Sequence, residues 1–535
     1  MLNLNVENLK HREKWAAAGV ALPKFDNRVM AEKTLTSPAW LHFGAGNIFR
    51  GYIARLQNQL LNAGKVGTGI IVAETFDFDI IDKIYIPYDL LSLLVTLGHD
   101  GNMDKEIIAS VAAAYRTDTG LDKLTAVFTN PSLQMVSFTI TEKGYALHAM
   151  DGSLLPLVET DMENAPCKAK HAMGLVAALL LARFRAGSHP LSLVSMDNCS
   201  HNGDRLKSAV ITVAKAWVDK GHAPAEFIEY LENPNKIAFP WSMIDKIVPR
   251  PAEVVQKQLE ESGIAQMRPI ITNKNTFIAP FVNGEGAEYL VIEDAFPAGR
   301  PPLHEVGVYF ADRDTVNKVE TMKVTTCLNP LHTALAVFGC LLGYGSIAKE
   351  MTDPNLVALV KKIGYDEGMK VVVDPGVISP KAFIDEVINR RLPNPFIPDA
   401  PQRIATDTSQ KVGIRFGETI KAYMARPELD VESLEGIPLA IAAWMRYLLA
   451  YDDDLNPMEL SPDPMLDTLL PQLEDIAPGD PASYTGQLKP ILSNGTLFGT
   501  NLYEAGLGKK IEAYFMEMLA GKGAVRTVLA KACPQ

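Results

Sequence analysis

Residues 40–51 read Trp-Leu-His-Phe-Gly-Ala-Gly-Asn-Ile-Phe-Arg-Gly. The apolar run predicts a strand that ends at Phe43, and a helical pattern begins directly after the glycine turn at residues 44–46. Such a turn lets backbone N–H groups and a helix N-terminus approach a pyrophosphate, because no side chain blocks the way. Phe49 stands where a Gly-x-Gly-x-x-Gly motif has its third glycine, and Gly51 comes two residues later. The stretch predicts a nucleotide-binding turn, with a plain tight connection as the alternative.

The end of the next predicted strand indicates which dinucleotide would bind. Glu74 closes the apolar run at residues 69–74. In dinucleotide-binding folds an acidic residue at about this distance from the turn contacts the adenosine ribose and favours NAD over NADP. Asp77 and Asp79 compete with Glu74 for this role, and a solvated strand end is the plain alternative. The sequence therefore predicts NAD as the cofactor.

The first half of the chain alternates short apolar runs with helical patterns, which is typical of a parallel sheet covered by helices. The expected strands are residues 40–43, 69–74, 135–141, 191–196 and 289–292, and expected helices include residues 50–63 and 171–186. We therefore expect an α/β domain over residues 1–305, ending after a loop rich in Pro and Gly.

Beyond about residue 310 the pattern changes to longer apolar-periodic stretches with few strand signals. These stretches are residues 331–349, 355–363, 438–450 and 502–519. They predict a mostly α-helical second domain over residues 306–535. The acidic, Pro-rich segment 452–464 is expected to be a surface insertion.

Composition excludes several classes of partner. The 535-residue chain carries a formal net charge of −12, which argues against nucleic acid because that partner requires clustered Lys and Arg. Its five cysteines include no Cys-x-x-Cys pair, so we expect reduced thiols rather than disulfides or a zinc knuckle. Residues 1–24 lack the apolar core of a signal peptide, and the most apolar stretches fall short of the ~20 residues that span a bilayer. We expect a soluble cytoplasmic protein with no membrane partner.

Lys323, Asn329 and His332 form a second group of residues suited to chemistry. Moving a hydride to or from a carbon–oxygen bond needs a proton acceptor for the alcohol and donors for the developing oxyanion. No Cys or His cluster has zinc-ligand spacing, so a lysine of depressed pKa beside asparagine amides is the metal-free solution. Asn329 precedes Pro330 and is expected to be a helix N-cap, which places His332 near the same helix face. The alternative is that Lys323 is a surface lysine, Asn329 only a helix cap and His332 a histidine of the core.

Six segments resemble the polyol-specific long-chain dehydrogenase/reductase family, also called the mannitol dehydrogenase family. They are residues 44–51, 139–145, 195–203, 239–249, 323–332 and 403–411, in the family's order. The resemblance implies a Rossmann-type N-terminal domain with a largely parallel sheet and a mostly helical C-terminal domain. It also implies an NAD-dependent, metal-independent oxidoreductase that acts on a sugar acid or polyol.

The resemblance assigns a role to each site residue. Lys323 would be the general base, and Asn198 and Asn329 would donate N–H groups to the oxyanion. Glu320 would help to move the proton to solvent. Substrate-binding roles are implied for His332, Arg403, Lys411, Asp245 and Lys246. Cofactor contacts are implied for Gly44, Gly46, Asn47, Phe49, Arg50, Glu74 and Lys143.

The spacing between Lys323 and Asn329 departs from the family's pattern. Five residues lie between them, whereas the family usually has four. On a continuous α-helix one extra residue rotates the amide by about 100°. We expect the connection at residues 325–328 to absorb the extra residue, because Pro330 favours a helix start.

Arg403, Lys411 and Lys246 would gather positive charge in an otherwise acidic chain, which suits a carboxylate-bearing ligand. Pairing with neighbours such as Asp407 and Asp245 is the alternative. The segments around residues 138–145 and 245–249 resemble the branch of the family that acts on mannonate. This implies reversible NAD-dependent interconversion of D-mannonate and D-fructuronate. Mannitol 2-dehydrogenase or another polyol dehydrogenase is the close alternative, and a non-catalytic protein that binds nucleotides or sugar acids is the alternative of another class.

Overall fold

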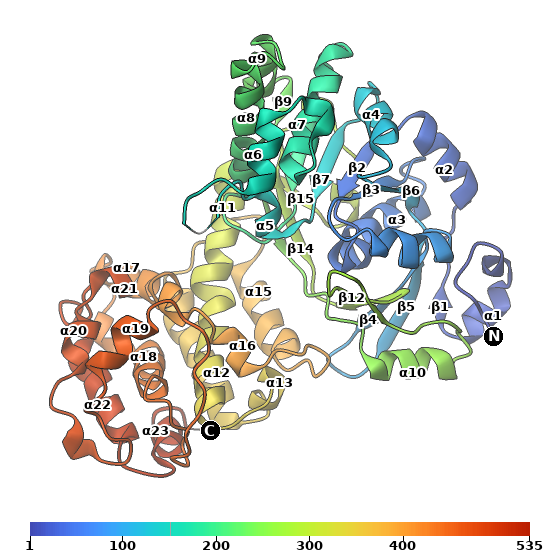
Figure 1. The fold of residues 1–535 in the computed structure, drawn as a ribbon. Coiled ribbons are helices and arrows are strands. Elements are labelled where there is room, and N and C mark those ends of the chain that lie inside the picture. Colours follow the sequence, from blue (N-terminus) through green and yellow to red (C-terminus); the bar gives the residue numbers. More distant parts are fainter. Residues whose placement is uncertain (150, 535) are drawn as a thin grey trace. The chain divides into compact units, whose positions relative to one another are not determined.

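The computed structural model describes residues 1–149 and 151–534 (Figure 1). The chain divides into two compact units, Met1–Asn317 and Lys318–Gln535. The division falls within helix α11 (Arg313–Met322). The domain boundary expected at residue 305 stays a prediction.

A six-stranded parallel sheet forms the centre of the first unit, in the order β6-β3-β2-β7-β8-β9. Its strands are β2 (Trp40–Phe43), β3 (Ile70–Glu74), β6 (Val111–Arg116), β7 (Met135–Phe138), β8 (Leu191–Ser195) and β9 (Ile237–Ala238). Counted along the chain, this is the 3-2-1-4-5-6 order of a dinucleotide-binding sheet, in which ligands bind where the order reverses. The reversal lies between β2 and β7, where Phe43 is in register with Phe138. The glycine turn therefore leaves the sheet at the position where this fold binds its ligand.

Both faces of this sheet are buried, which explains the nearly continuous apolar strands. Leu41 and Phe43 belong to the core on one face, which includes residues of helices α4 (Leu121–Thr129), α7 (Ala172–Arg185) and α8 (Asn202–Asp219). Trp40 belongs to the core on the other face, with residues of helix α3 (Ala54–Asn62) and strand β13 (Phe281–Glu285). The alternation follows the two-residue period of a strand.

Two smaller sheets in the first unit also position site residues. One has the order β1-β5-β4-β13 and adds strands β1 (Val20–Ala21), β5 (Met103–Ile108) and β4 (Ser92–Leu97). The other has the order β10-β14-β15, with strands β10 (Ser242–Asp245), β14 (Tyr289–Glu293) and β15 (Tyr309–Ala311). β15 is parallel to β14, so residues beyond 305 complete a sheet of the first unit.

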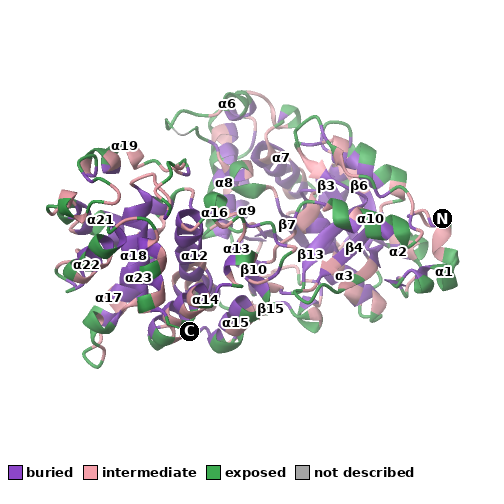
Figure 2. Ribbon diagram, turned by 90° about the horizontal axis from the view of Figure 1, so that it is seen from below, coloured by how far each residue is buried: buried purple, intermediate pink, exposed green. Residues whose placement is uncertain are grey.

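The second unit is helical, and each strand assigned in the described residues precedes it. Helices α12 (Asn329–Leu341) and α18 (Gly436–Tyr447) are almost entirely buried, as Figure 2 shows by their colour. A helix that is apolar on nearly every side belongs in a core. α12 packs against α18 and against α16 (Pro401–Ile404), and α18 packs against α22 (Gly508–Met518).

One helical run, Arg313–Leu341, has 29 residues and is long and apolar enough to cross a membrane by length and composition alone. Of its most apolar window, 78% is buried inside the protein. Core helices of globular proteins pass the same test, because burial in protein selects the same side chains as burial in lipid.

Candidate active site

Gly44 and Gly46 give the turn after β2 its shape. Gly44 has φ +103°, and a Cβ there would lie 2.2 Å from the carbonyl oxygen of Thr139, so only glycine fits. A Cβ on Gly46 would meet no atom within 4 Å. The open side of the turn is the space through which a pyrophosphate would reach backbone N–H groups. The turn therefore fits a dinucleotide.

Gly51 supplies the packing expected of the displaced third glycine. Residues Phe49–Ile53 form a π-helical turn, η2, directly after the glycine turn. A Cβ on Gly51 would lie 3.2 Å from side-chain carbons of Val248 and Val282. Close helix–strand packing is the role of the third glycine in the motif. The glycine is thus displaced within a wider helical turn, and its function is retained.

The side chains of Phe49 and Arg50 point into the interior, and their expected contacts with the cofactor stay predictions. Phe49 is fully buried, and its ring stacks on His42 with the ring centroids 4.4 Å apart. Arg50 donates hydrogen bonds to Ser92 Oγ and to the carbonyl oxygen of Pro280, both at 2.9 Å. Burial lowers the pKa of Arg50 to about 10. Both side chains stabilise the π-helical turn against the strands beside it.

Glu74 holds the glycine turn in place. Its buried carboxylate accepts a hydrogen bond from the Ala45 N–H at 2.8 Å. It also accepts bonds from the N–H groups of Thr75, Phe76 and Asp77 at 3.0, 2.9 and 3.2 Å. These four donors occupy both carboxylate oxygens, so Glu74 acts here as a positioning residue. Its contact with a ribose stays a prediction.

Asn47 and Lys143 remain accessible on either side of the strand-order reversal. Asn47 follows the glycine turn and is partly exposed, and its amide nitrogen lies 3.4 Å from the carbonyl oxygen of Phe277. Lys143 is exposed on helix α5 (Thr141–Tyr145), which follows β7. Their cofactor contacts also stay predictions.

Asp197 fixes the loop that follows β8. Its carboxylate accepts N–H bonds from Ile140 and Thr141, both at 2.9 Å, and a bond from the Tyr145 hydroxyl at 2.6 Å. Burial raises the pKa of Asp197 above its ordinary value, and these donors oppose that shift. The contacts join the loops at the carboxyl ends of β7 and β8. Asn198, the next residue, is therefore carried by an anchored loop.

Asn202 fixes the other end of the same loop. Its side-chain amide donates to the carbonyl oxygens of Ser195, Asp197 and Ser242 at 3.2, 3.1 and 3.0 Å. Its own side-chain oxygen accepts the Ser242 N–H at 3.0 Å. This network connects β8 to β10 across the loop that carries Asn198.

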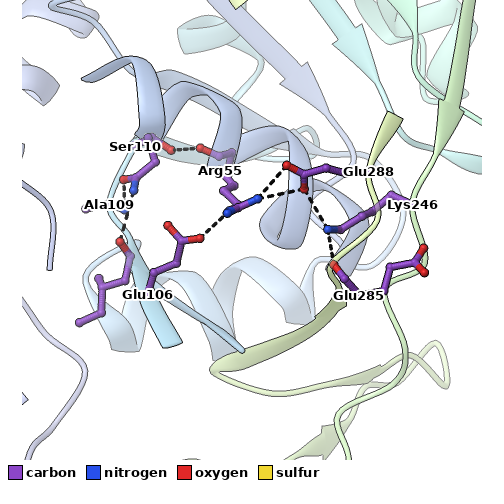
Figure 3. A network of polar contacts seen from close by, with 10 residues as sticks. Arg55, Glu106, Ala109, Ser110, Lys246, Glu285 and Glu288 are labelled. Atoms are coloured by element: carbon purple, nitrogen blue, oxygen red, sulfur yellow. Dashed lines mark hydrogen bonds and ion pairs between the residues drawn. The ribbon is translucent and has the colours of Figure 1, made fainter. Parts of the chain in front are cut away.

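The Lys246 side chain lies in an ion network whose other charged members are partly exposed (Figure 3). Its Nζ donates to the Glu288 carboxylate at 2.9 Å and to the Glu285 carbonyl oxygen at 2.6 Å. Arg55 binds the same Glu288 at 2.8 Å and Glu106 at 2.5 Å. Only 1% of the Lys246 side chain is exposed, and burial lowers its pKa. Lys246 therefore joins secondary-structure elements. The substrate-binding roles of Lys246 and of Asp245, which is buried at the end of β10, stay predictions.

Lys323 begins a π-helical turn, η7 (Lys323–Cys327), between α11 and α12. The Leu328 N–H donates to the Lys323 carbonyl oxygen at 3.1 Å, which is the i→i+5 bond of a π-helix. Such a turn holds one more residue than an α-helical turn, so the extra residue is accommodated within η7, before the bend at Leu328. The N-cap of α12 is Leu328, and the expected cap role of Asn329 is wrong.

Lys323 is buried, and Glu320 lies three residues before it on α11, partly exposed. Residues three apart on a helix share a face. Asn329 is partly exposed at the first position of α12, and His332 lies three residues later. The second unit thus carries Glu320, Lys323, Asn329 and His332 on one continuous helical run.

Asp399, which the sequence reading missed, joins two of the expected substrate-binding residues. Nε2 of His332 lies 3.3 Å from Asp399 Oδ2, within ion-pair distance but outside hydrogen-bond geometry. Arg403 binds the other oxygen of the same carboxylate. The four-residue spacing of Asp399 and Arg403 is the sequence signal for this pair. Arg403 thus pairs with Asp399, whereas the alternative considered from the sequence was a neighbour such as Asp407.

Lys411 and Arg415 extend this cationic cluster. Lys411 Nζ donates to the carbonyl oxygen of Thr406 and lies 3.5 Å from that of Ile404. Arg415, which the sequence reading also missed, lies on the π-helical turn η12 (Gly413–Gly417) and donates from Nη1 to Thr333 Oγ1 at 2.5 Å. Burial lowers the pKa of Arg415 to about 10. Its four-residue spacing from Lys411 was the available sequence signal.

Metal ligation has no candidate in the described parts of the chain. Among residues 1–149 and 151–534, no group of three or more His, Cys, Asp or Glu side chains is placed to hold a metal ion. The polar chemistry of the site rests on the amides, the lysines and the arginines described above.

Comparison with known proteins gives matches along nearly the whole chain. The family description "Mannitol dehydrogenase Rossmann domain" matches residues 38–304, and "Mannitol dehydrogenase C-terminal domain" matches residues 315–517. The D-mannonate oxidoreductase of Thermotoga maritima is 54% identical over 533 residues, which cover 99% of this chain and 98% of that protein. The D-mannonate oxidoreductase of Escherichia coli is 28% identical over 523 residues, which cover 96% and 98%.

Solved structures give the same fold. The Pseudomonas fluorescens mannitol 2-dehydrogenase, in a ternary complex with NAD and D-mannitol, is 25% identical with a TM-score of 0.69 and 99% coverage of both chains. A substrate-free D-sorbitol dehydrogenase superposes with a TM-score of 0.76 at 23% identity, over 97% of this chain and 98% of that chain.

Proposed function

Because the chain belongs to the mannitol dehydrogenase family, we propose that it catalyses the reversible NAD-dependent interconversion of D-mannonate and D-fructuronate. The chain is an oxidoreductase that acts on a secondary alcohol. One observation carries the choice of substrate: the 54% identity to the Thermotoga maritima D-mannonate oxidoreductase over 99% of this chain. The match with that relative covers both units of this chain.

The glycine turn supports NAD as the cofactor, because Gly46 leaves its open side free of side chains. NAD held at the glycine turn would supply the hydride acceptor for oxidation of the alcohol, and NADH would supply the hydride donor for reduction of the keto carbon. The chain's own groups must manage the proton and the charge on the oxygen.

We assign these tasks to the lysine and the two amides. Lys323 Nζ takes the hydroxyl proton during oxidation and returns it to the keto oxygen during reduction. Asn198 and Asn329 each donate a side-chain N–H to that oxygen, whose negative charge grows during hydride transfer. Glu320, three residues before Lys323 and partly exposed, passes the proton between the lysine and solvent. This mechanism needs no metal ion.

A substrate panel tests the proposed reaction. The rate of NADH oxidation is measured with fructuronate, tagaturonate, fructose and fructose 6-phosphate. We expect the highest kcat/KM with fructuronate. The highest value with fructose would instead favour a mannitol 2-dehydrogenase, the activity named for the solved neighbour. Binding of NADH without turnover of any of the four would favour a non-catalytic binding protein.

The variant Lys323→Ala tests the lysine as the base. We expect kcat with fructuronate to fall by about 10²- to 10⁴-fold, which is the usual contribution of a positioned general base. Lys349→Ala, which removes an exposed lysine of the same unit, is the matched control and should keep the wild-type rate. Equal rates for Lys323→Ala and the wild type would rule out the lysine as the base.

A further inference from the structure

Buried arginines elsewhere in this protein use their N–H groups on protein acceptors. Arg183 makes five hydrogen bonds, all to backbone carbonyl oxygens. Arg446 donates to the carbonyl oxygens of Tyr451, Asp452 and Met518. In both cases the guanidinium ties loops to a helix, and few donors remain for a ligand. These residues show how this fold uses an arginine for structure alone.

Arg415 is different, and it is only partly buried. Its side chain makes one hydrogen bond, from Nη1 to Thr333 Oγ1 at 2.5 Å. Within residues 1–149 and 151–534, no carboxylate lies at ion-pair distance from it, and its Nε and Nη2 groups have no protein acceptor. Burial with no neighbouring anion lowers its pKa to about 10, so it stays charged at neutral pH. Nε–H and Nη2–H form the planar fork that binds a carboxylate through two parallel bonds.

The position of Arg415 places it beside the proposed catalytic residues of the second unit. Its turn, η12, packs against η7, the turn that Lys323 begins. Its partner Thr333 lies four residues after Asn329 on α12, one helical turn along the same face. Arg415 is therefore held against the helical run that carries Lys323 and Asn329.

The other cations of the cluster are already engaged. Arg403 is paired with Asp399, and Lys411 donates to backbone carbonyl oxygens. The pKa of Lys411 is lowered, first by burial and next by the charge of Arg415, while Asp407 and Asp463 act in the opposite direction. An anionic ligand at Arg415 would relieve this repulsion between two cations.

We propose that Arg415 binds the carboxylate of the sugar acid and thereby selects sugar acids over neutral polyols. This inference rests on the proposed function and adds the residue that recognises the carboxylate. A charge-assisted bidentate contact strengthens binding only for a substrate that carries the anion. A neutral ketose gains nothing from it.

The variant Arg415→Gln separates recognition from a structural role. We expect KM for fructuronate to rise by about 10- to 100-fold, because one charge-assisted contact is lost. We expect kcat/KM for fructose to stay within about threefold of the wild type. An arginine that only supported the turn through Thr333 would lower activity on both substrates equally, and that result would overturn the inference. An unchanged KM for fructuronate would also overturn it.

Two further variants keep the test decisive. Arg390→Gln removes an exposed arginine of the same unit and is the matched control, with wild-type constants expected for both substrates. Arg415→Lys keeps the charge but loses the fork, so it should fold even if Arg415→Gln does not, and its KM for fructuronate should be intermediate. Arg415→Gln could fail to fold. In that case a KM for fructuronate in Arg415→Lys equal to that of the wild type would contradict bidentate recognition.

Binding of D-mannonate, measured by calorimetry on the full chain, distinguishes failure of the inference from failure of the proposed function. We expect the wild type to bind D-mannonate about 10- to 100-fold more tightly than Arg415→Gln. Such a difference without turnover of fructuronate would reject the proposed reaction and keep Arg415 as the carboxylate-binding residue. Turnover of fructuronate with equal binding by both proteins would keep the reaction and reject the inference.

Discussion

Gly44 and Gly46 are two residues apart, yet a methyl group has opposite consequences at the two positions. At Gly44 it would lie 2.2 Å from a backbone oxygen, in a conformation with φ +103°. At Gly46 it would enter open space. Gly44 is therefore required by the fold, whereas Gly46 is not, and its predicted role is to let a ligand approach the backbone.

We expect Gly46→Ala to keep Tm within about 2 °C of the wild type while raising KM for NADH by about tenfold or more. Gly44→Ala should instead lower the free energy of unfolding by about 1–3 kcal/mol, because Cβ collides with the chain. Thermal denaturation and NADH titration of both variants make the comparison. Wild-type NADH affinity in Gly46→Ala would mean that the open side of the turn does not receive the pyrophosphate.

Glu350 is a buried carboxyl group with a strongly shifted pKa. It is fully buried, and neither of its carboxyl oxygens has a hydrogen-bond partner among the described residues. It fits against α12 only because residue 339 is glycine, where a Cβ would lie 2.1 Å from Glu350 Oε1. Burial raises its pKa to about 9, so the carboxyl is neutral at pH 7.

The raised pKa predicts a loss of stability at alkaline pH. The folded state holds a proton that the unfolded chain releases near pH 4.5, so the stabilisation is complete below that pH and is lost as pH rises to about 9. The free energy of unfolding should therefore fall with rising pH in this range. We expect Glu350→Gln to reduce the slope of the free energy of unfolding against pH by about 1 kcal/mol per pH unit. Urea unfolding at pH 6 and pH 8.5 measures it, with exposed Glu428→Gln as the control. Parallel pH dependence in Glu350→Gln and the wild type would refute the assignment.

At the scale of elements, local pattern predicts the central strands well. The expected strand at residues 40–43 is β2, and that at 191–196 is β8 with one residue fewer, because both are continuous apolar runs bounded by turns. β5 was not predicted, since Asp104, Lys105 and Glu106 interrupt its apolar pattern. Its pairing with β4 and β1 is decided by tertiary structure.

The candidate site shows the same limit. The residues that could carry chemistry are visible in the sequence by type and spacing, but the direction of each side chain is not. Phe49, Arg50 and Lys246 lie in motifs that match the family, and yet they are buried among partners distant in the chain. The segment 452–464 lies largely at the surface, as expected. Its buried Asp453 nevertheless accepts N–H bonds from Val525 and Arg526 at the start of helix α23 (Ala524–Ala532), a contact that the sequence does not reveal.

The π-helical turn η7 yields a prediction about the spacing of catalytic residues. When a π-turn absorbs an extra residue, the helices before and after it keep the relative orientation that they would have without that residue. Deleting Thr325 should convert η7 into an α-helical turn and restore the four-residue spacing between Lys323 and Asn329. We expect kcat with fructuronate to stay within about tenfold of the wild type.

An alanine inserted between Cys327 and Leu328 is the opposite change and the control. It adds a second extra residue, which would rotate Asn329 by about 100° on a helix and should reduce kcat by about 10²-fold or more. The deletion and the insertion could instead reduce activity equally. That result would mean that catalysis requires the π-turn itself, and not only the relative orientation of the helices on either side of it.

At the scale of the whole molecule, β15 decides where the first unit can be separated. β15 pairs with β14, and Val308 beside it is buried in the core of the unit. We expect a fragment of residues 1–312 to fold and to bind NADH within about tenfold of the full chain, without turning over any substrate because it lacks Lys323. A fragment of residues 1–305 should have a lower Tm, because it loses a strand and its core contacts.

Denaturation and NADH titration of the two fragments compare them directly. Equal Tm values would place the folding boundary at residue 305, as the sequence suggests. A fragment of residues 1–312 that remains unfolded would show that the first unit needs the second for stability.

The carboxylate of Glu74 has a consequence for how this lineage can change its coenzyme. With the ribose at its predicted position beside Glu74, a phosphate on that ribose would meet the negative charge of this strand end, so adaptation to such a cofactor would favour loss of the acid. Loss of Glu74 would also release the N–H groups of Ala45 and of the three residues after the strand. The same substitution would then loosen the turn that receives either coenzyme. A neutral side chain that still accepts the Ala45 N–H, such as glutamine at position 74, would remove the charge without releasing that contact, and it is therefore the step that a change of coenzyme would pass through.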